Sequence, residues 1–375
     1  MNHFLEKVLK TLTYFINKIL VKLRLYRYFF RPVKLEKPIF VVGCSRAGTT
    51  LIYKTLSESK HLGSLQKETH DFWANLHPIE ERNWESHEIP AELASDNDID
   101  QVSNLFYIQT GQKRIVDKNN QNGLSIPYLV KLFPDAHFIY IKRNAGDNIN
   151  SLIQGWNKAN EFATWSNMLP ETVDIEGGKN KRWCFFLAKG WKRYTKANIE
   201  EVCAFQYRAI NEAILDAKES VSKEQWHEIS YEVLIENPSK EFEFIFKACD
   251  VPFDSDLKQH CNDVLQKPYN IFSEIRVDKW KEGEVLLTQW FEDAEALGSP
   301  PGPSAHALLA QIYLYFASDE KKDSPEEAQF YRKAEPHAQI AVFRATEPRE
   351  NWYQLYLSVL LFDDRYEEAV PILEA

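Results

Sequence analysis

The fold is decided by the stretch PIFVVGCSRAGTT, which spans residues 38–50. Its apolar and β-branched part, residues 39–42, predicts a short buried strand. A loop with two glycines follows, and residues 49–57 then have the pattern of a helix. A loop of this kind directs backbone N–H groups and the positive end of the helix dipole toward one point. The stretch therefore predicts a binding site for phosphate or sulfate.

Two more strands are predicted further along the chain, over residues 137–142 and 226–231. Helical patterns follow them and cover residues 147–156, 181–218 and 240–249. Strands that alternate with helices favour a parallel sheet with crossover helices. We therefore predict an α/β fold of three layers, in which helices flank a parallel sheet.

The length of 375 residues indicates two domains, at about 150 residues per domain. The strongest linker signal is the GSPPG segment at residues 298–302. We predict an N-terminal helix over residues 1–36, a main domain over 37–298 and a small all-α region over 304–375. The helical patterns of the last region cover residues 305–317, 325–345, 351–362 and 365 onward.

The C-terminal helices carry small and aromatic residues at spaced positions, which are Ala307, Leu309, Ala310, Tyr313, Trp352, Leu355, Tyr356 and residues 366–369. These positions resemble the helix pairs of tetratricopeptide repeats, and a protein partner is the ligand expected for such helices. Because two helix pairs are too few to be stable alone, we expect the array to continue in a longer parent protein. A helical extension with no repeat ancestry is the alternative.

The charge balance is acidic, with 45 Lys and Arg against 55 Asp and Glu and a net charge of −10. This balance argues against nucleic acid as a partner. The five cysteines are scattered and form no C-x-x-C pair, so neither a disulfide framework nor a zinc site is predicted. Scattered cysteines favour a reducing compartment, and we predict a cytoplasmic protein.

Residues 4–30 combine apolar positions at helical spacing with many basic residues. The longest charge-free stretch ends at Lys18, so the segment is too short to span a membrane, and it shows no signal-peptide cleavage site. Two interpretations are open. The segment is either an interfacial helix that lies on anionic lipid, peripheral to the membrane, or a helix whose apolar stripe docks on its own domain.

Residues 43–50 have the spacing of the nucleotide P-loop, G-x-x-x-x-G-K-S/T, with one change. Thr49 stands where a kinase has the Lys that reaches the β- and γ-phosphates, which argues against a kinase or an ATPase. Arg46 lies inside the loop instead. Its cation can stabilise negative charge on a transferring group or on a leaving phosphate.

With these residues the loop resembles the 5′-phosphosulfate loop of the sulfotransferases that use 3′-phosphoadenosine 5′-phosphosulfate (PAPS). The match covers residues 38–50, with Ser45 where the family usually has proline. The resemblance implies a fold like that of the P-loop nucleotide hydrolases and PAPS as the co-substrate. It also implies which residues bind the donor, namely Ser45, Arg46, Ala47, Gly48, Thr49 and Thr50.

A second anion site is predicted where Arg143 follows the strand over residues 137–142. Ligands of open α/β sheets bind at the carboxyl ends of strands, and Arg offers a fork of donors to a phosphate. Ser151 lies eight residues on (151 − 143 = 8) and adds a hydroxyl. Residues 133–147 resemble the 3′-phosphate motif of the same family, which implies that Arg143 and Ser151 bind that phosphate. A surface salt bridge between Arg143 and Asp147 is the alternative.

Two softer likenesses lie downstream. Tyr231 begins a YEVL segment that resembles the family's Tyr-Glu element, which implies a contact with the nucleotide. A core tyrosine at the end of a strand is the alternative for this residue. Lys279 and Trp280 resemble a late Lys-Trp element near the bound nucleotide.

Sulfuryl transfer needs a base, because the acceptor hydroxyl or amine must lose a proton. Residues 66–73 resemble the Lys-Glu element of glycan- and protein-directed sulfotransferases, which implies Glu68 as the base and His70 as the second choice. In small-molecule members the base is a His two residues after a Lys. The comparable Lys here is Lys118, which the resemblance implies steadies the donor sulfate, and Asn120 replaces the His. For Glu68 the alternative is a solvated charged turn.

The sequence thus predicts a sulfotransferase that moves a sulfuryl group from PAPS to a glycan, lipid or peptide, with no metal required. Tryptophans that could stack on sugar rings, or could instead belong to the core, are Trp156, Trp165, Trp183 and Trp191. Two other functions remain open. These are a P-loop nucleotide kinase and a catalytically inactive protein that binds nucleotide or serves as a scaffold.

Overall fold

The structure is a computed structural model that describes residues 3–266, 302–319, 322, 324–346, 348 and 350–373. The chain divides into two compact units, Met1–Val277 and Asp278–Ala375. Lys279, Trp280 and residues 298–301 of the expected linker lie outside the described residues. The domain limits near residues 298 and 304 therefore stay predictions.

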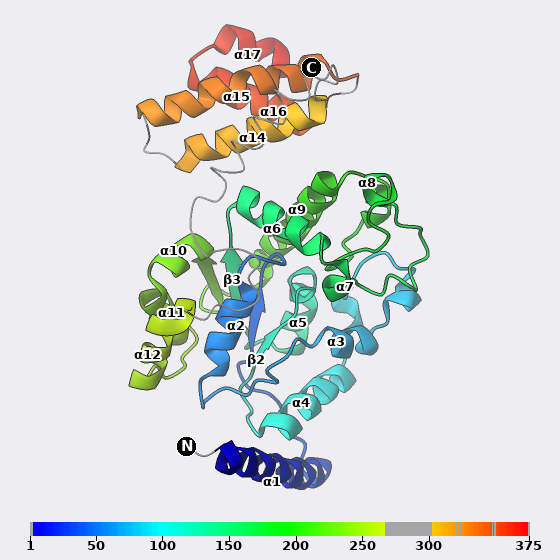
Figure 1. Cartoon of the computed structure of the whole chain (residues 1–375), viewed down its shortest axis with the longest axis vertical. Coiled ribbons are helices and arrows are strands. Elements are labelled where there is room, and N and C mark those ends of the chain that lie inside the picture. The colour runs from blue at the N-terminus through cyan, green and yellow to red at the C-terminus, as the bar shows by residue number, and fades with distance from the viewer. Residues whose placement is uncertain are drawn as a thin grey trace. The chain divides into compact units, whose positions relative to one another are not determined.

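A parallel sheet lies in the first unit, and its described strands follow the order β2-β1-β3-β4. The strands are β1 (Ile39–Val42), β2 (Val116–Lys118), β3 (His137–Lys142) and β4 (Trp226–Ser230). Helices flank the sheet (Figure 1), so the predicted α/β fold is confirmed. The bounds of β1 and β3 match the prediction. Strand β2 was not predicted, because three residues are too few to show a periodicity.

Strand pairing brings the carboxyl ends of the strands to one edge of the sheet. Val41 of β1 pairs with Lys118, the last residue of β2. On the other side of β1, Val42 pairs with Tyr140 of β3. Lys142 of β3 in turn pairs with Ser230, the last residue of β4. The segments that follow β1, β3 and β4 therefore start side by side at this edge.

Helix α2 (Thr49–Ser57) follows β1 with the predicted bounds, and α6 (Ala145–Trp156) follows β3. The unit also contains α1 (His3–Phe30), α3 (His70–Leu76), α4 (Asp96–Thr110), α5 (Ile126–Leu132), α7 (Ala159–Phe162), α8 (Ile175–Gly178), α9 (Ile199–Ala217), α10 (Tyr231–Glu236), α11 (Pro238–Ala248) and α12 (Ser255–Asp263). Most of the predicted helices are thus present, with limits that differ by a few residues.

The predicted helix over residues 181–218 is wrong in its first half. Only α9 is an α-helix there, and the preceding residues form turns and a short 3-10 helix, Trp191–Tyr194. Trp183 and Trp191 are fully buried and pack edge to face, with ring centroids 5.2 Å apart. The indole N–H groups of this segment donate to backbone carbonyls, which lets it enter the core without a regular helix. Trp156, Trp183 and Trp191 are therefore core residues, and stacking on an acceptor sugar by these three is wrong.

The second unit is helical in its described part, as predicted. Its helices are α14 (Pro303–Asp319), α15 (Pro325–Phe343), α16 (Glu350–Phe362) and α17 (Tyr366–Leu373). Buried alanines such as Ala310, Ala338 and Ala341 lie in one core cluster with Trp352 and Tyr356. Small side chains let neighbouring helices approach closely while the aromatic rings fill the remaining space. Whether these pairs are tetratricopeptide repeats stays a prediction.

Gly48, at the start of α2, is fixed by both its backbone and its surroundings. Its φ angle is +106°, and an added Cβ would lie 2.6 Å from Cδ2 of Tyr231. We expect Gly48→Ala to destabilise the protein by about 2–4 kcal/mol, from left-handed strain and from the clash with the ring. Urea-induced unfolding followed by circular dichroism measures this effect.

Gly190→Ala is the matched control for that substitution. Gly190 also has a positive φ angle, +89°, but an added Cβ would have nothing within 4 Å. This variant should lose only about 1–2 kcal/mol from backbone strain. Equal losses in the two variants would contradict close packing between Gly48 and Tyr231.

Candidate active site

The loop between β1 and α2 is almost fully buried, although it carries polar residues. Ser45, Ala47 and Thr49 are each exposed by 6% or less. Asn148 of α6 donates through Nδ2 to the carbonyl of Ser45 at 2.8 Å and holds the loop in place. Gly48 is the N-cap of α2, and no side chain caps the helix there. The first N–H groups of α2 are therefore oriented toward a ligand position, as in other anion-binding loops.

Arg143 joins the end of β3 to this loop. Its Nη1 donates to the carbonyl of Arg46 at 2.8 Å. The guanidinium also lies over the ring of Tyr231, 4.4 Å from its centroid, in a cation–π contact. On the backbone side, the hydroxyl of Tyr207 donates to the carbonyl of Arg143 at 3.1 Å. These contacts fix Arg143 at the edge of the sheet, as the sequence predicted, and not in a solvated position.

The Arg46 side chain points toward α6. Its Nε donates to Oγ of Ser151 at 3.4 Å, and its guanidinium lies 5.8 Å from the ring centroid of Phe162. Burial and the nearby positive charge of Arg143 together lower the pKa of Arg46 to about 10. Two partly buried guanidinium groups that repel each other favour the binding of an anion between or beside them.

Glu68 lies next to this cationic region and forms an ion pair with Lys118. Lys118 Nζ donates to Glu68 Oε1, and Nδ1 of His70 lies 3.5 Å from Glu68 Oε2. Burial alone would raise the pKa of Glu68, but the charge of Lys118 and the hydrogen bonds from His70 and Lys118 lower it to about 2. Glu68 is thus paired and partly buried, so the alternative of a solvated charged turn is wrong.

Asp117 holds this pair in position and was not identified from the sequence. Its carboxylate is fully buried and accepts hydrogen bonds from Thr69 Oγ1 at 2.7 Å, Trp73 Nε1 at 3.0 Å and Asn122 Nδ2 at 3.1 Å. Thr69 follows Glu68, and Asp117 precedes Lys118, so one carboxylate fixes both backbones. Burial raises the pKa of Asp117, and its hydrogen bonds counteract that effect. The available signal was a single acidic residue directly after the apolar pair Ile115 and Val116.

The fold brings together all of the described residues that the sequence selected. The loop residues Ser45 to Thr50, with Arg143, Ser151 and Tyr231, line one edge of the sheet, and the charge of Glu68 reaches Arg46. Ser151 contacts Arg46, however, and is not bonded to Arg143. Arg46, Ser151 and Arg143 are therefore neighbours at this edge of the sheet.

The residues also fit a ligand with phosphate or sulfate groups. Oγ of Ser45 and Nε of Arg143 are buried atoms with no hydrogen-bond partner among the described residues. Buried polar atoms are seldom left unsatisfied, and both of these are donors that an anionic oxygen would accept from.

Comparison with known families agrees with this chemistry. The profile of the sulfotransferase family matches residues 38–255, which is more than half of the chain. The chain therefore belongs to the sulfotransferase family. A comparison with curated protein sequences gave no match.

Several solved structures are similar to this chain. A sulfotransferase from Alicyclobacillus acidocaldarius is 17% identical, with a TM-score of 0.40, over 73% of this chain and 99% of that one. Sulfotransferase STF9 from Mycobacterium avium is 15% identical, with a TM-score of 0.41, over 72% and 81%. Mouse sulfotransferase SULT7A1, solved with PAP, is 14% identical, with a TM-score of 0.35, over 66% and 70%.

Because Glu68 forms this ion pair, we expect part of the free energy of unfolding to depend on pH. The pKa of Glu68 is lowered from 4.5 to about 2 in the folded protein. Its contribution is therefore complete above pH 4.5 and is lost as the pH falls toward 2. We expect Glu68→Gln to cost about 1–2 kcal/mol near neutral pH, after allowance for its partial exposure, and to cost little at the acidic end. Urea titrations across this pH range measure the difference.

Glu36→Gln provides the control for this measurement. Glu36 pairs with Lys113 at the surface, where both side chains are more than half exposed. Its removal should change the unfolding free energy little at any pH. If the Glu68 difference stayed constant from neutral to acidic pH, the ion pair with Lys118 would not exist in solution.

Proposed function

We propose that this protein transfers a sulfuryl group from PAPS to a hydroxyl or amine of a glycan, lipid or peptide acceptor. One observation supports this most strongly: at the carboxyl edge of the sheet, Arg143 bonds to the backbone of Arg46, and the charge of Glu68, which pairs with Lys118, reaches Arg46. The cations suit the charged donor and the carboxylate suits the acceptor proton. Bound PAPS would supply the activated sulfuryl group.

In this proposal each residue has a distinct task. The β1–α2 loop, with Ser45 and Arg46, binds the 5′-phosphosulfate, and Arg46 stabilises the charge that develops on the leaving phosphate. Arg143 and Ser151 bind the 3′-phosphate, and Tyr231 packs beside them.

Glu68 accepts the proton of the acceptor. A carboxylate with a pKa near 2 is a weak base at neutral pH. An anion that binds the ammonium group of Lys118 competes with Glu68 for that group. The ion pair between Lys118 and Glu68 then weakens, and the pKa of Glu68 rises. Donor binding and activation of the base are thereby coupled through Lys118.

A nucleotide kinase is the second candidate, and the strand ends argue against it. Mg²⁺ in kinase sites is held by oxygen ligands, usually carboxylates. Among the described strands, β2 ends with Lys118 and β3 is followed by Arg143, so cations occupy this edge. Thr49 also replaces the phosphate-binding lysine of the P-loop.

Binding of adenosine 3′,5′-bisphosphate distinguishes these functions. Titration calorimetry without Mg²⁺ should show binding of the bisphosphate, and Arg143→Ala should weaken it about 100-fold or more through the loss of a charge-assisted contact. Lys142→Ala is the matched control, because Lys142 is half exposed and pairs with Glu228. Tight Mg²⁺-dependent binding of ATP, with no binding of the bisphosphate, would favour the kinase.

Transfer of radiolabelled sulfate across a panel of hydroxyl and amine acceptors tests activity. Glu68→Gln should lower the rate about 100-fold or more, because the proton acceptor is removed, and it should not weaken bisphosphate binding, because Lys118 is released from its ion pair. His70→Gln should have a smaller effect. Full activity of Glu68→Gln would exclude Glu68 as the base. A wild-type protein that binds the bisphosphate but transfers no sulfate would favour the third candidate, a nucleotide-binding scaffold.

We also propose that α1 lies on anionic membranes. One face of α1 docks on α4, where Arg24 Nη1 donates to the carbonyl of Gln109 at 3.1 Å and Tyr28 OH donates to that of Asp100 at 3.1 Å. The interpretation of α1 as a helix that docks on its own domain explains only the face that contacts α4. Large apolar residues remain exposed on the rest of the helix, namely Phe15, Ile16, Ile19, Leu20, Leu23, Leu25, Tyr26, Phe29 and Phe30.

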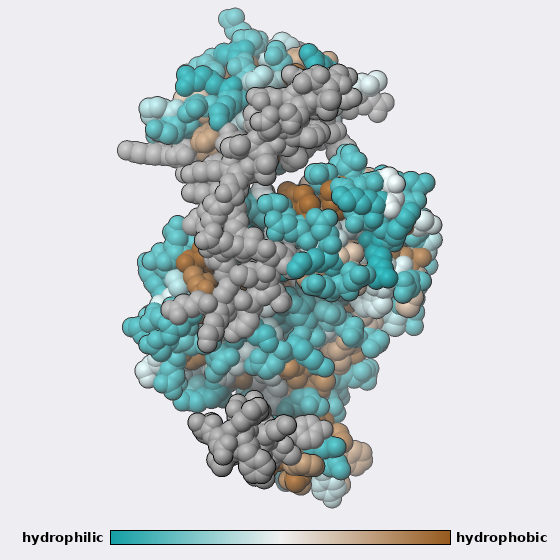
Figure 2. All heavy atoms as spheres, viewed as in Figure 1, coloured by the Kyte–Doolittle hydropathy of each residue, from teal (hydrophilic) through white to brown (hydrophobic). Residues whose placement is uncertain are grey.

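Basic residues lie next to this apolar surface. In Figure 2, α1 is at the bottom of the view, where hydrophobic residues (brown) lie beside hydrophilic ones (teal). Lys22, Arg27 and Arg31 are exposed near it. Within the described residues, every helix is too short or too polar to span a bilayer. An amphipathic basic helix that binds lipid headgroups and inserts its apolar side chains fits these features.

Vesicle co-sedimentation tests this binding. The full chain should sediment with vesicles that contain phosphatidylserine and remain in solution with neutral phosphatidylcholine vesicles. Phe29→Ser with Phe30→Ser should reduce binding about tenfold, because each change removes an exposed aromatic anchor without affecting the α4 contact. Equal sedimentation of the variant and the wild type would exclude α1 as the membrane contact.

A further inference from the structure

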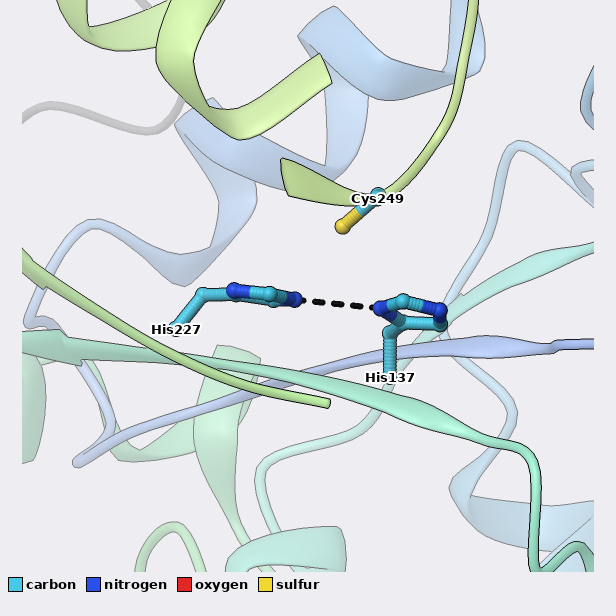
Figure 3. A group of neighbouring side chains, drawn as sticks. All are labelled: His137, His227 and Cys249. Atoms are coloured by element: carbon cyan, nitrogen blue, oxygen red, sulfur yellow. Dashed lines mark hydrogen bonds between the residues drawn. The ribbon is translucent and has the colours of Figure 1, made fainter. Parts of the chain in front are cut away.

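Three side chains with metal-binding atoms converge at the amino end of the sheet. They are His137 of β3, His227 of β4 and Cys249, which follows α11, and their ligand atoms all lie within 4.8 Å of one another. Nδ1 of His137 and Nε2 of His227 are 3.0 Å apart (Figure 3). The thiol of Cys249 points toward the two rings. The site described above uses none of these residues.

Strand register explains why the two rings meet. His227 pairs with Ile139, which lies two residues after His137 on the same strand. Side chains two residues apart project from the same face, so His137 and His227 are diagonal neighbours on that face. Both rings therefore take their positions from the sheet and not from a loop.

Cys249 is held against the rings by its own backbone contacts. Its N–H donates to the carbonyl of Ile245 at 3.0 Å, and its carbonyl accepts from Nη2 of Arg114. Nη1 of the same guanidinium donates to the carbonyl of Asp250 at 2.9 Å, and Nε donates to that of Lys37 at 3.2 Å. One arginine thus ties the end of α11 to the segment that enters β1. The thiol is presented to the rings by a fixed backbone.

We propose that His137, His227 and Cys249 bind one Zn²⁺ ion. Tetrahedral zinc, with Zn–N near 2.0–2.1 Å and Zn–S near 2.3 Å, places its ligand atoms roughly 3.3–3.6 Å apart. The observed distance of 3.0 Å between His137 Nδ1 and His227 Nε2 and the overall limit of 4.8 Å bracket this spacing, so the three ligand atoms already lie near the positions that one zinc ion needs. Binding replaces the thiol proton of Cys249, which passes to solvent.

The donor set and its surroundings favour zinc. Two imidazoles and one thiolate are soft to borderline ligands, which zinc prefers over Mg²⁺ or Ca²⁺. Cys249 is fully buried, and His137 and His227 are only 5% and 7% exposed, so all three donors lie in the interior of the unit. A water molecule takes the fourth position.

The site has a structural task because it lies far from the anion-binding edge. His137 begins β3 and Arg143 directly follows it, six residues on (143 − 137 = 6), which is about 20 Å at 3.3 Å per residue. Zinc there connects the end of α11 to β3 and β4. These are the strands whose other ends carry Arg143 and Tyr231. The metal therefore stabilises the sheet that supports the anion site and takes no part in transfer.

The sequence could not predict this cluster. The two histidines are 90 residues apart, and Cys249 is 22 residues beyond His227 (249 − 227 = 22). No short ligand motif connects them, so the sequence prediction of no zinc site rested on spacing alone.

Metal binding by the full chain tests the proposal. Protein purified without chelator and dialysed should contain one equivalent of zinc by mass spectrometry. Cobalt substitution should give the visible bands of tetrahedral Co²⁺ and a thiolate-to-cobalt charge-transfer band. Zinc should also raise the midpoint of thermal unfolding by several degrees, because the ion binds the folded chain.

Substitutions separate ligation from other roles. Cys249→Ser and His137→Gln should each weaken zinc binding more than about 100-fold, beyond the 10–100-fold effect of losing an outer-shell partner. Cys261→Ser is the matched control, because Cys261 is a buried free cysteine in α12 of the same unit. Circular dichroism confirms that each variant is folded. If Cys249→Ser does not fold, the His137→Gln titration and the charge-transfer band of the wild type still decide the question.

Two results would overturn the proposal. A wild-type protein that binds no stoichiometric zinc would show that the rings form a histidine–histidine hydrogen bond only. Zinc binding that Cys249→Ser and His137→Gln leave unchanged would place the metal elsewhere.

Discussion

The parallel pairing of β1 with β3 is the constraint on which the rest of this structure depends. It places Val42 beside Tyr140, so the loop that leaves β1 and the arginine that follows β3 reach the same edge. The hydrogen bond from Arg143 to the carbonyl of Arg46 then joins them. A shift of one residue along either strand would turn the side chains to the other face and separate the two cations.

Electrostatics at this edge is balanced for an anionic substrate. Arg46 and Arg143 are partly buried and are held close together by packing on Phe162, Tyr231 and the loop backbone, although their charges repel. Lys118 is neutralised by Glu68, and Asp117 fixes the backbone beneath both. The site thus holds two guanidinium groups at this edge and keeps its candidate bases, Glu68 and His70, close to Lys118. Sulfuryl transfer makes use of both properties.

Local pattern was sufficient for the parts of the fold that depend on neighbours in sequence. β1, β3 and α2 have the predicted bounds because each shows an apolar run or a helical period with clear limits. The strand β2 and the turns before α9 were missed, since long-range packing decides their conformation. Arg46, Glu68 and Arg143 were found through motifs, whereas Asp117 and the His137–His227–Cys249 cluster arise only from tertiary contacts.

A crystal structure with adenosine 3′,5′-bisphosphate tests the central claim, that one continuous cationic site binds both ends of the donor nucleotide. The account predicts the 5′-phosphate against the backbone of residues 43–50, and the 3′-phosphate within hydrogen-bond distance of Arg143. A bisphosphate bound elsewhere on the protein, with Arg143 contacting no phosphate, would contradict it.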